Sequence, residues 1–255
     1  LGSLMFIEPE DGYWIIASDQ TELAVEGLLT DPNTLYSLHS GPNLVSYPFA
    51  GSAPIAETIP IEAQESFIGI IGEGAAALNM ENEWVGGLQE LSGTEGYWFI
   101  TNEAVDFTYN PPVEGAARLA SLIRAVPLEY SFRQSTKQAF YFIESATISG
   151  KPLKEEDLII AYNGDVIIGS RYFYGKITDV PAMGSDVDPV YAGYAEAGDI
   201  ITFKVLTSTG DLIDMDTHDN TRWDNLGMTV IQLSEKVLPQ ESTLSTAYPN
   251  PFNPT

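Results

Sequence analysis

The chain of 255 residues has 36 acidic and 11 basic side chains, a formal net charge of −25, and no cysteine. This charge argues against nucleic acid and anionic membranes as partners, because both are negatively charged, and the lack of cysteine excludes disulfides. Apolar residues make up 44% of the chain, which is enough for packed cores. The sequence has no run of about 18 apolar residues, so it predicts no membrane-spanning helix.

Two stretches of the chain resemble each other at a constant offset. Leu1–Ile16 matches Val85–Ile100, and both contain Gly-Tyr-Trp after an acidic residue. Glycine favours a turn, and side chains of the following strand alternate between the two faces of a sheet. The pattern predicts a repeated strand–turn–strand unit. Residues 1–27 are then the C-terminal half of a first repeat module, and residues 41–110 are a complete second module.

The tryptophans of this pattern, Trp14 and Trp98, are predicted to occupy equivalent places. Core packing is the first role to consider for them, and stacking on a sugar ring is the alternative. The chain opens at Leu1 without an initiator methionine or signal peptide, so we expect a mature or trimmed fragment. The missing half of the first module either lies upstream or is supplied by a neighbouring subunit, because an open β edge invites pairing.

The next segments alternate between linker and strand signals. Residues 28–40 contain Asp-Pro-Asn and are predicted as a linker. A short helix is expected within Ala53–Glu65, limited by its prolines. Strands are expected at Phe67–Ile71 and Ala75–Met80, joined by a Gly-Glu-Gly turn. This turn imitates a dinucleotide-binding loop, but no long helix follows it, so we reject nucleotide binding.

The remaining chain is predicted as a linker followed by a third unit. Residues 111–126 begin with two prolines and form the linker, with a short helix expected at Glu114–Ala125. Residues 127–236 read as a β-sandwich domain, in which Asn163-Gly164 is a strong hairpin signal. The fold class is therefore all-β, with tandem small β-sandwich-like modules and Pro-rich linkers.

Acidic residues supply the metal candidates. Hard oxygen ligands suit Ca²⁺, so a structural Ca²⁺ is the one cofactor that the sequence suggests, and a solvated acidic surface is the alternative. One candidate cluster is Asp186 with Asp188, to which Asp179 could be added, and the other is Asp211, Asp214, Asp216, Asp219 and Asn220. No catalytic residue is predicted: the chain has two histidines, and abundant carboxylates without geometry define no acid–base pair. We therefore predict that the chain is not an enzyme.

A run of aromatic residues gives a candidate interface. Tyr172-Phe173-Tyr174 is expected on a strand at 172–177, with Phe173 in the core and both tyrosines on the opposite face. Exposed tyrosines would suit a protein interface or a sugar platform. A cross-strand pair is the simpler alternative.

The final residues resemble a known sorting signal. Tyr248-Pro249-Asn250-Pro251-Phe252-Asn253-Pro254-Thr255 is similar to the opening of the C-terminal sorting domain of the type IX secretion system of Bacteroidota and related phyla. The upstream segments are similar to accessory β repeat modules of such cargo proteins. The resemblance implies export across the outer membrane, then release or attachment at the cell surface. Residues 237–255 are therefore predicted as an extended linker and the start of the sorting domain.

Three functions remain open at this point. The first is a non-catalytic extracellular structural or adhesive protein, whose sharpest form is a filament or surface-layer subunit assembled by β-strand complementation. Its partners would be further copies or other cell-surface proteins. The second is a carbohydrate-binding accessory module of a secreted hydrolase. The third, a hydrolase, requires a catalytic domain upstream of Leu1.

Overall fold

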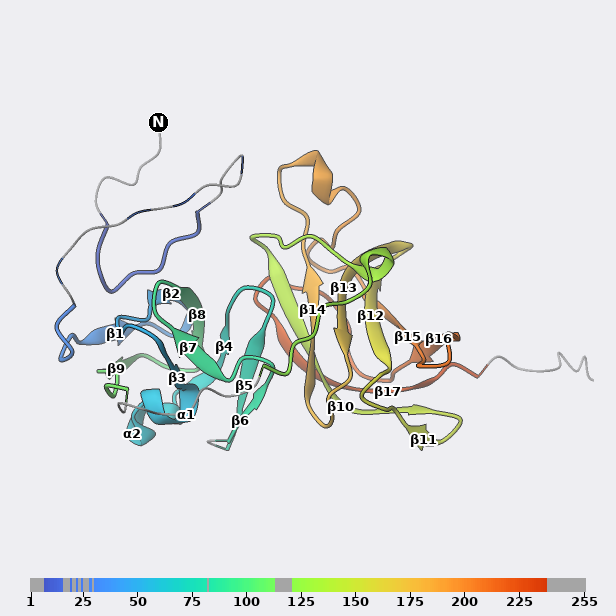
Figure 1. The fold of residues 1–255 in the computed structure, drawn as a ribbon, viewed down its shortest axis with the longest axis horizontal. Helices are drawn as coiled ribbons and strands as arrows, with labels where there is room; N and C mark the ends of the chain where they lie inside the picture. Colours follow the sequence, from blue (N-terminus) through green and yellow to red (C-terminus); the bar gives the residue numbers. More distant parts are fainter. Residues whose placement is uncertain are drawn as a thin grey trace, which may run out of the picture.

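The computed structural model describes residues 7–15, 19, 22, 24, 28, 30–81, 83–112 and 121–237. These residues form almost only β structure, which confirms the predicted all-β class. Two β domains lie side by side, the N-terminal one blue to teal and the C-terminal one lime to red (Figure 1). None of the helices within the described residues has the length and apolar character required to cross a membrane.

The N-terminal domain is built on a five-stranded antiparallel sheet of order β2-β8-β4-β5-β6, with two small two-stranded sheets beside it. Its elements are β1 (Tyr36–Leu38), β2 (Gly41–Ser46), β3 (Ser52–Pro54), α1 (Ile55–Thr58), α2 (Ile61–Gln64), β4 (Phe67–Ile71), β5 (Ala76–Met80), β6 (Glu83–Gly86), β7 (Glu90–Ser92), β8 (Gly96–Thr101) and β9 (Val105–Phe107). The expected short helix is thus two single turns, because Pro60 interrupts it.

Alternation along the strands explains how this sheet packs. On β8, Tyr97 and Phe99 are buried on one face among other aromatic rings, such as Tyr109. The linker predicted at 28–40 is wrong in its second half, because Tyr36–Leu38 forms β1 and pairs with β9. Two buried apolar residues flank one serine there, a strand pattern that the nearby turn signal obscured.

The C-terminal domain is one curled, eight-stranded sheet. Its strand path is β11-β10-β17-β16-β15-β12-β13, and β14 pairs with β10. The elements are the 3₁₀ turn η1 (Leu128–Tyr130), β10 (Gln138–Ile148), β11 (Lys151–Pro152), β12 (Leu158–Asn163), β13 (Val166–Tyr172), β14 (Thr178–Met183), the 3₁₀ turn η2 (Pro189–Tyr191), β15 (Thr202–Leu206), β16 (Leu212–Asp216) and β17 (Met228–Glu235). The predicted hairpin forms, but its turn is Gly164-Asp165, one residue later than the predicted Asn163-Gly164, and Gly164 has φ 57°.

The sheet curls until strands from its two ends approach each other. A Cβ added at Gly169 of β13 would lie 1.6 Å from the carbonyl oxygen of Pro181 in β14, so only glycine allows this approach. The strand predicted at 172–177 is wrong: β13 ends at Tyr172, and a turn leads to β14. The buried strand β14 contains a proline. A proline in a sequence argues against a central strand, so this strand is hard to predict from the sequence.

A third apolar cluster joins the two domains. Ile71, Ala76 and Leu78 of the N-terminal sheet pack with Phe140 and Phe142 of β10. Glycines let the two sheets approach, since a Cβ on Gly86 would lie 3.1 Å from the Phe142 ring. The domains therefore share a core.

The described part of the N-terminal segment covers one edge of the N-terminal sheet. Asp11 forms an antiparallel bridge with Val45 of β2, and Gly12 N–H donates to Leu44 O at 3.0 Å. Strand β8 pairs with the other edge of β2. Residues 12–15 do not form a strand, whereas the matching residues of β8 lie in the middle of the sheet. At residues 12–15 the predicted repeat therefore has no structural counterpart, and most of the predicted first module, residues 1–27, lies outside the described residues.

Candidate functional site

The β4–β5 turn, residues 72–75, is held by the C-terminal domain. Three side chains of that domain form hydrogen bonds to its main chain or to Ala76 just after it, and all three are almost fully buried. The bonds run from Gln138 Nε2 to Gly72 O at 3.1 Å, from Arg171 Nη2 to Gly74 O, and from Ala76 N–H to Asp179 Oδ2 at 2.9 Å. The glycine-rich sequence that imitates a nucleotide-binding loop is therefore a docking element between domains.

Asp179 lies at the centre of this junction and is fully buried. Arg171 Nε donates to the main-chain oxygen of Asp179 at 2.9 Å, its Nη2 lies 3.5 Å from Oδ2, and the Tyr174 hydroxyl donates to Oδ1 at 2.7 Å. Burial raises the pKa of Asp179, while the guanidinium and the hydrogen bonds oppose that rise. Burial and the neighbouring carboxyl also raise the pKa of Tyr174. The network fixes one wall of the adjoining cleft.

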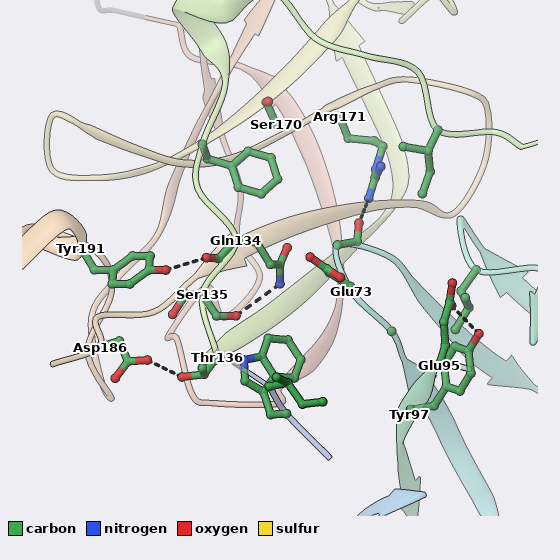
Figure 2. Close-up of a pocket in the computed structure, with 18 of the residues that line it drawn as sticks. Glu73, Glu95, Tyr97, Gln134, Ser135, Thr136, Ser170, Arg171, Asp186 and Tyr191 are labelled. Atoms are coloured by element: carbon green, nitrogen blue, oxygen red, sulfur yellow. Dashed lines mark hydrogen bonds between the residues drawn. The ribbon is translucent and has the colours of Figure 1, made fainter. Parts of the chain in front are cut away.

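A cleft of about 1070 Å³ opens above this junction, between the two domains. Figure 2 shows Glu95 and Tyr97 on one side of it, Asp186 and Tyr191 on the other, and Glu73 between them. Its lining comes from the N-terminal segment, the β4–β5 turn, the start of β8, residues 123–136, the end of β13 and residues 186–191. Both domains therefore contribute side chains to one site.

Aromatic rings line both walls of the cleft. Trp14 is 38% exposed, and Tyr13 beside it is half-buried. Tyr191 on the opposite wall is half-buried, and its hydroxyl donates to the Gln134 main-chain oxygen at 2.8 Å. Tyr97 is almost fully buried, and burial raises the pKa of its hydroxyl, which donates to Glu95 at 2.7 Å. The rings offer flat apolar surface next to hydrogen-bonding groups.

Four carboxyl groups line the cleft, Glu73 and Glu95 from one domain and Asp186 and Asp188 from the other. Asp186 accepts hydrogen bonds from the Thr136 hydroxyl at 2.5 Å and from Val187 N–H at 2.7 Å, which lower its pKa. None of the four pairs with a cation among the described residues. The cleft is therefore acidic as well as aromatic.

The two cationic side chains of the lining already have partners within the protein. Arg171 is committed to Asp179 and Gly74 as described. The Arg124 guanidinium lies 4.2 Å from the Tyr172 ring centroid and donates to Glu155 O.

The four predicted aromatic site residues lie in different surroundings. Trp14 lines the cleft, whereas Trp98 packs against the core between the domains. Their predicted equivalence is therefore wrong. Tyr172 is half-buried beneath Arg124, and Tyr174 turns its hydroxyl inward to Asp179. The expectation of two exposed tyrosines on one strand face is also wrong, because the strand ends between them.

The two predicted acidic clusters also lie in different surroundings. Asp186 and Asp188 line the cleft, where Asp188 accepts from Val190 N–H at 2.9 Å. The second run is mostly strand rather than loop. Asp214 and Asp216 are exposed on β16, on either side of the buried Met215, and Asp214 pairs with Lys204 at 2.9 Å.

The remaining acidic residues of that run are hydrogen-bonded within the protein. Asp211 accepts from the Thr209 hydroxyl, and Asp219 accepts from Gln232 N–H at 2.7 Å. Within the described residues, no three acidic or histidine side chains gather into a group able to hold a metal. Asp214 and Asp216 are two residues apart because alternate side chains of a strand point to the same face of the sheet. In the sequence alone, the same spacing suggested metal ligands.

Several cleft residues had no recognisable signal in the sequence. Glu73, Gln134, Thr136 and Tyr191 are brought together only by the packing of the two domains. Arg171 could have been noticed as one of 11 basic residues, placed beside a predicted buried strand. Comparison with family models, with curated proteins and with solved structures gives no match to this chain, so the function of the cleft is argued from its geometry.

Proposed function

We propose that this protein is an exported, non-catalytic adhesive module that binds a polysaccharide in the cleft between its domains. The combination of aromatic rings and polar groups on two fixed walls is the observation that supports it. Sugars have flat C–H faces that stack on aromatic rings, and hydroxyls that both donate and accept hydrogen bonds. Trp14 and Tyr191 supply rings, and Gln134, Thr136 and Arg171 supply polar atoms.

The size of the cleft favours an extended ligand. Pockets for small molecules span roughly 300–1,000 Å³, and this cleft of about 1070 Å³ lies at the upper end of that range and is open to solvent. Its lining comes from both domains, so a ligand would contact both at once. A shared core and a buried hydrogen-bond network hold these walls in place, which lowers the entropic cost of ordering them on binding.

Export is the second part of the proposal. The resemblance of Tyr248–Thr255 to a type IX sorting domain supports it, although these residues lie outside the described part of the chain. A strongly acidic surface suits a protein that remains soluble outside the cell, because like charges oppose aggregation. Fractionating cells that produce a tagged chain, with and without residues 237–255, tests this part, and retention of both forms inside the cell would reject it.

Binding is tested by replacing the exposed ring of the cleft. Trp14→Ala is expected to weaken binding to an immobilised polysaccharide by about tenfold or more, since stacking contacts of this kind contribute about 1–3 kcal/mol. Affinity electrophoresis against a panel of soluble polysaccharides gives the measurement. Trp84→Ala is the matched control, because Trp84 lies in the N-terminal domain and outside the cleft lining. Equal binding by both variants would reject the cleft as the site.

Self-assembly by strand complementation is a second candidate function. It is favoured by the edge of β2, where residues 10–12 form only a short contact through main-chain bonds. A segment from another copy would pair with the same edge in a filament or surface layer. We expect deletion of residues 1–15 to change the oligomeric state under light scattering and electron microscopy, and deletion of residues 237–255 tests the C-terminal segment as donor. Monomers before and after both deletions would reject this candidate.

A further inference from the structure

We propose that residues 8–15, which we call the N-terminal strap, couple the cleft to the outer edge of β2. The strap covers this edge only while it holds Trp14 in the cleft. A polysaccharide in the cleft and a second copy of the chain on the edge therefore exclude each other. This inference rests on the proposed function and names its regulation, in which binding in the cleft suppresses self-assembly.

The upstream half of the strap is attached to β2 through its main chain. Gly12 N–H donates to Leu44 O at 3.0 Å, and Ser46 N–H donates to Glu10 O at 3.1 Å. The Ser46 hydroxyl also donates to Pro9 O at 2.5 Å. A strand from a second copy would use the same main-chain groups of β2. The edge can therefore accept the strap or a second copy, but not both at once.

A proline explains why the strap leaves the sheet where it does. Asp11 pairs with Val45 in antiparallel register, so the next hydrogen-bonded pair along the edge would join Trp14 to Pro42. Proline has no N–H group and cannot donate to such a partner. Residues 13–15 line the cleft instead of extending the sheet. The same short segment therefore covers the edge with one half and forms part of the cleft with the other.

A hydrogen bond joins the two halves of the strap. Glu8 N–H donates to the hydroxyl of Tyr13, which lines the cleft, at 2.7 Å. Gly12 lies between them, and a Cβ at this position would lie 2.9 Å from Val45 O. Because this oxygen belongs to the main chain of β2, a side-chain rotation cannot relieve the contact. A larger residue at position 12 is therefore expected to detach the strap as a unit, with Trp14 included.

The size of the coupling follows from the contribution of Trp14 to binding. Loss of this ring is expected to weaken polysaccharide binding by about tenfold, so the detached state binds about tenfold more weakly than the attached state. Coupling between two sites is reciprocal. Saturating polysaccharide is therefore expected to lower the fraction of detached straps by the same factor of about ten, and with it the number of β2 edges open to a second copy.

The test replaces Gly12 with threonine in the full chain. The matched control is Asp11→Thr, because the Asp11 side chain is exposed and its bridge to β2 uses main-chain groups. Tryptophans are labelled with fluorine for NMR, and the Trp14 resonance is assigned from Trp14→Phe. In Gly12→Thr we expect this resonance to move to the position of solvent-exposed tryptophan. We also expect amide exchange at Ser46 to become at least about tenfold faster, since local opening exposes its N–H group.

Two further measurements on the same variants address function. Affinity electrophoresis against laminarin, xylan and dextran is expected to show about tenfold weaker binding by Gly12→Thr, as for loss of the Trp14 ring. Sedimentation velocity at increasing protein concentration is expected to show association of Gly12→Thr. Asp11→Thr should match the parent chain in every measurement.

Trp14→Ala tests the coupling from the other end. It removes the ring from the cleft and leaves Gly12 and the edge contacts in place. Because coupling is reciprocal, we expect amide exchange at Ser46 to become about threefold faster in this variant. Unchanged exchange at Ser46 would contradict the coupling, whatever the effect of the Gly12 variant on folding.

The outcomes separate this inference from the proposed function. Parent-like binding by Gly12→Thr, together with weakened binding by Trp14→Ala, would overturn the coupling and leave polysaccharide binding in place. A parent chain that bound none of the three polysaccharides would overturn both, even if Trp14 and Ser46 still responded together. A Gly12→Thr variant with fast exchange at Ser46 that stayed monomeric would reject a second copy as the other occupant of the edge, and the inference with it.

Discussion

Replacing Asp179 with alanine is expected to lower the free energy of unfolding by about 3–5 kcal/mol, because removing one partner of a buried ion pair leaves the other charge uncompensated. Arg171 would remain buried with its guanidinium facing a cavity, and Ala76 N–H and the Tyr174 hydroxyl would lose their acceptor. Urea unfolding followed by tryptophan fluorescence measures the change.

The protein contains a matched control for this substitution. Lys204 and Asp214 form the other ion pair of the described residues, at 2.9 Å on the exposed face of the sheet. Asp214→Ala is expected to cost no more than about 1 kcal/mol, because solvent screens an exposed pair. If the Asp179 and Asp214 variants unfolded at the same urea concentration, the junction network would not be a source of stability.

The second large effect is expected at Phe142. Its ring is fully buried in the core that the two domains share. Phe142→Ala is expected to destabilise the protein by about 3–5 kcal/mol, since it removes apolar contacts and leaves a cavity. Because this cavity lies between the domains, we also expect the parent protein to unfold in one transition and the variant in two. Scanning calorimetry measures both effects.

Phe49→Ala provides the comparison for this result. Phe49 is half-buried at the periphery of the N-terminal core and does not contact the shared cluster. Its replacement is expected to cost less and to leave one transition. Two transitions already present in the parent protein would contradict the coupling that we infer from the shared core.

These two predictions bear on function through the cleft. Its two walls belong to different domains, so their separation depends on the junction at Asp179 and on the shared core around Phe142. A junction that moved freely would place Trp14 and Tyr191 at variable distances. A fixed junction keeps them arranged for one ligand.

Local patterns in the sequence were enough to predict much of the secondary structure. Phe67–Ile71 forms the strand predicted there, and a hairpin forms next to the Asn163-Gly164 signal, because short-range preferences decide both. The acidic run from Asp211 to Asp219 predicts either calcium ligands or a solvated acidic surface, and neither alternative identifies strand β16. On this strand Asp214 is exposed and Met215 is buried. Without the partner strand β15, the spacing of the acidic residues cannot be told apart from the spacing of metal ligands.

The all-β class and the acidic surface follow from the sequence alone, since both depend on composition and on patterns a few residues long. The junction and the cleft do not. Arg171, Asp179 and Ala76 meet because two sheets pack face to face, and the cleft collects residues from Tyr13 to Tyr191. Contacts between distant residues depend on the tertiary packing of complementary surfaces, for which a single sequence contains no local signal.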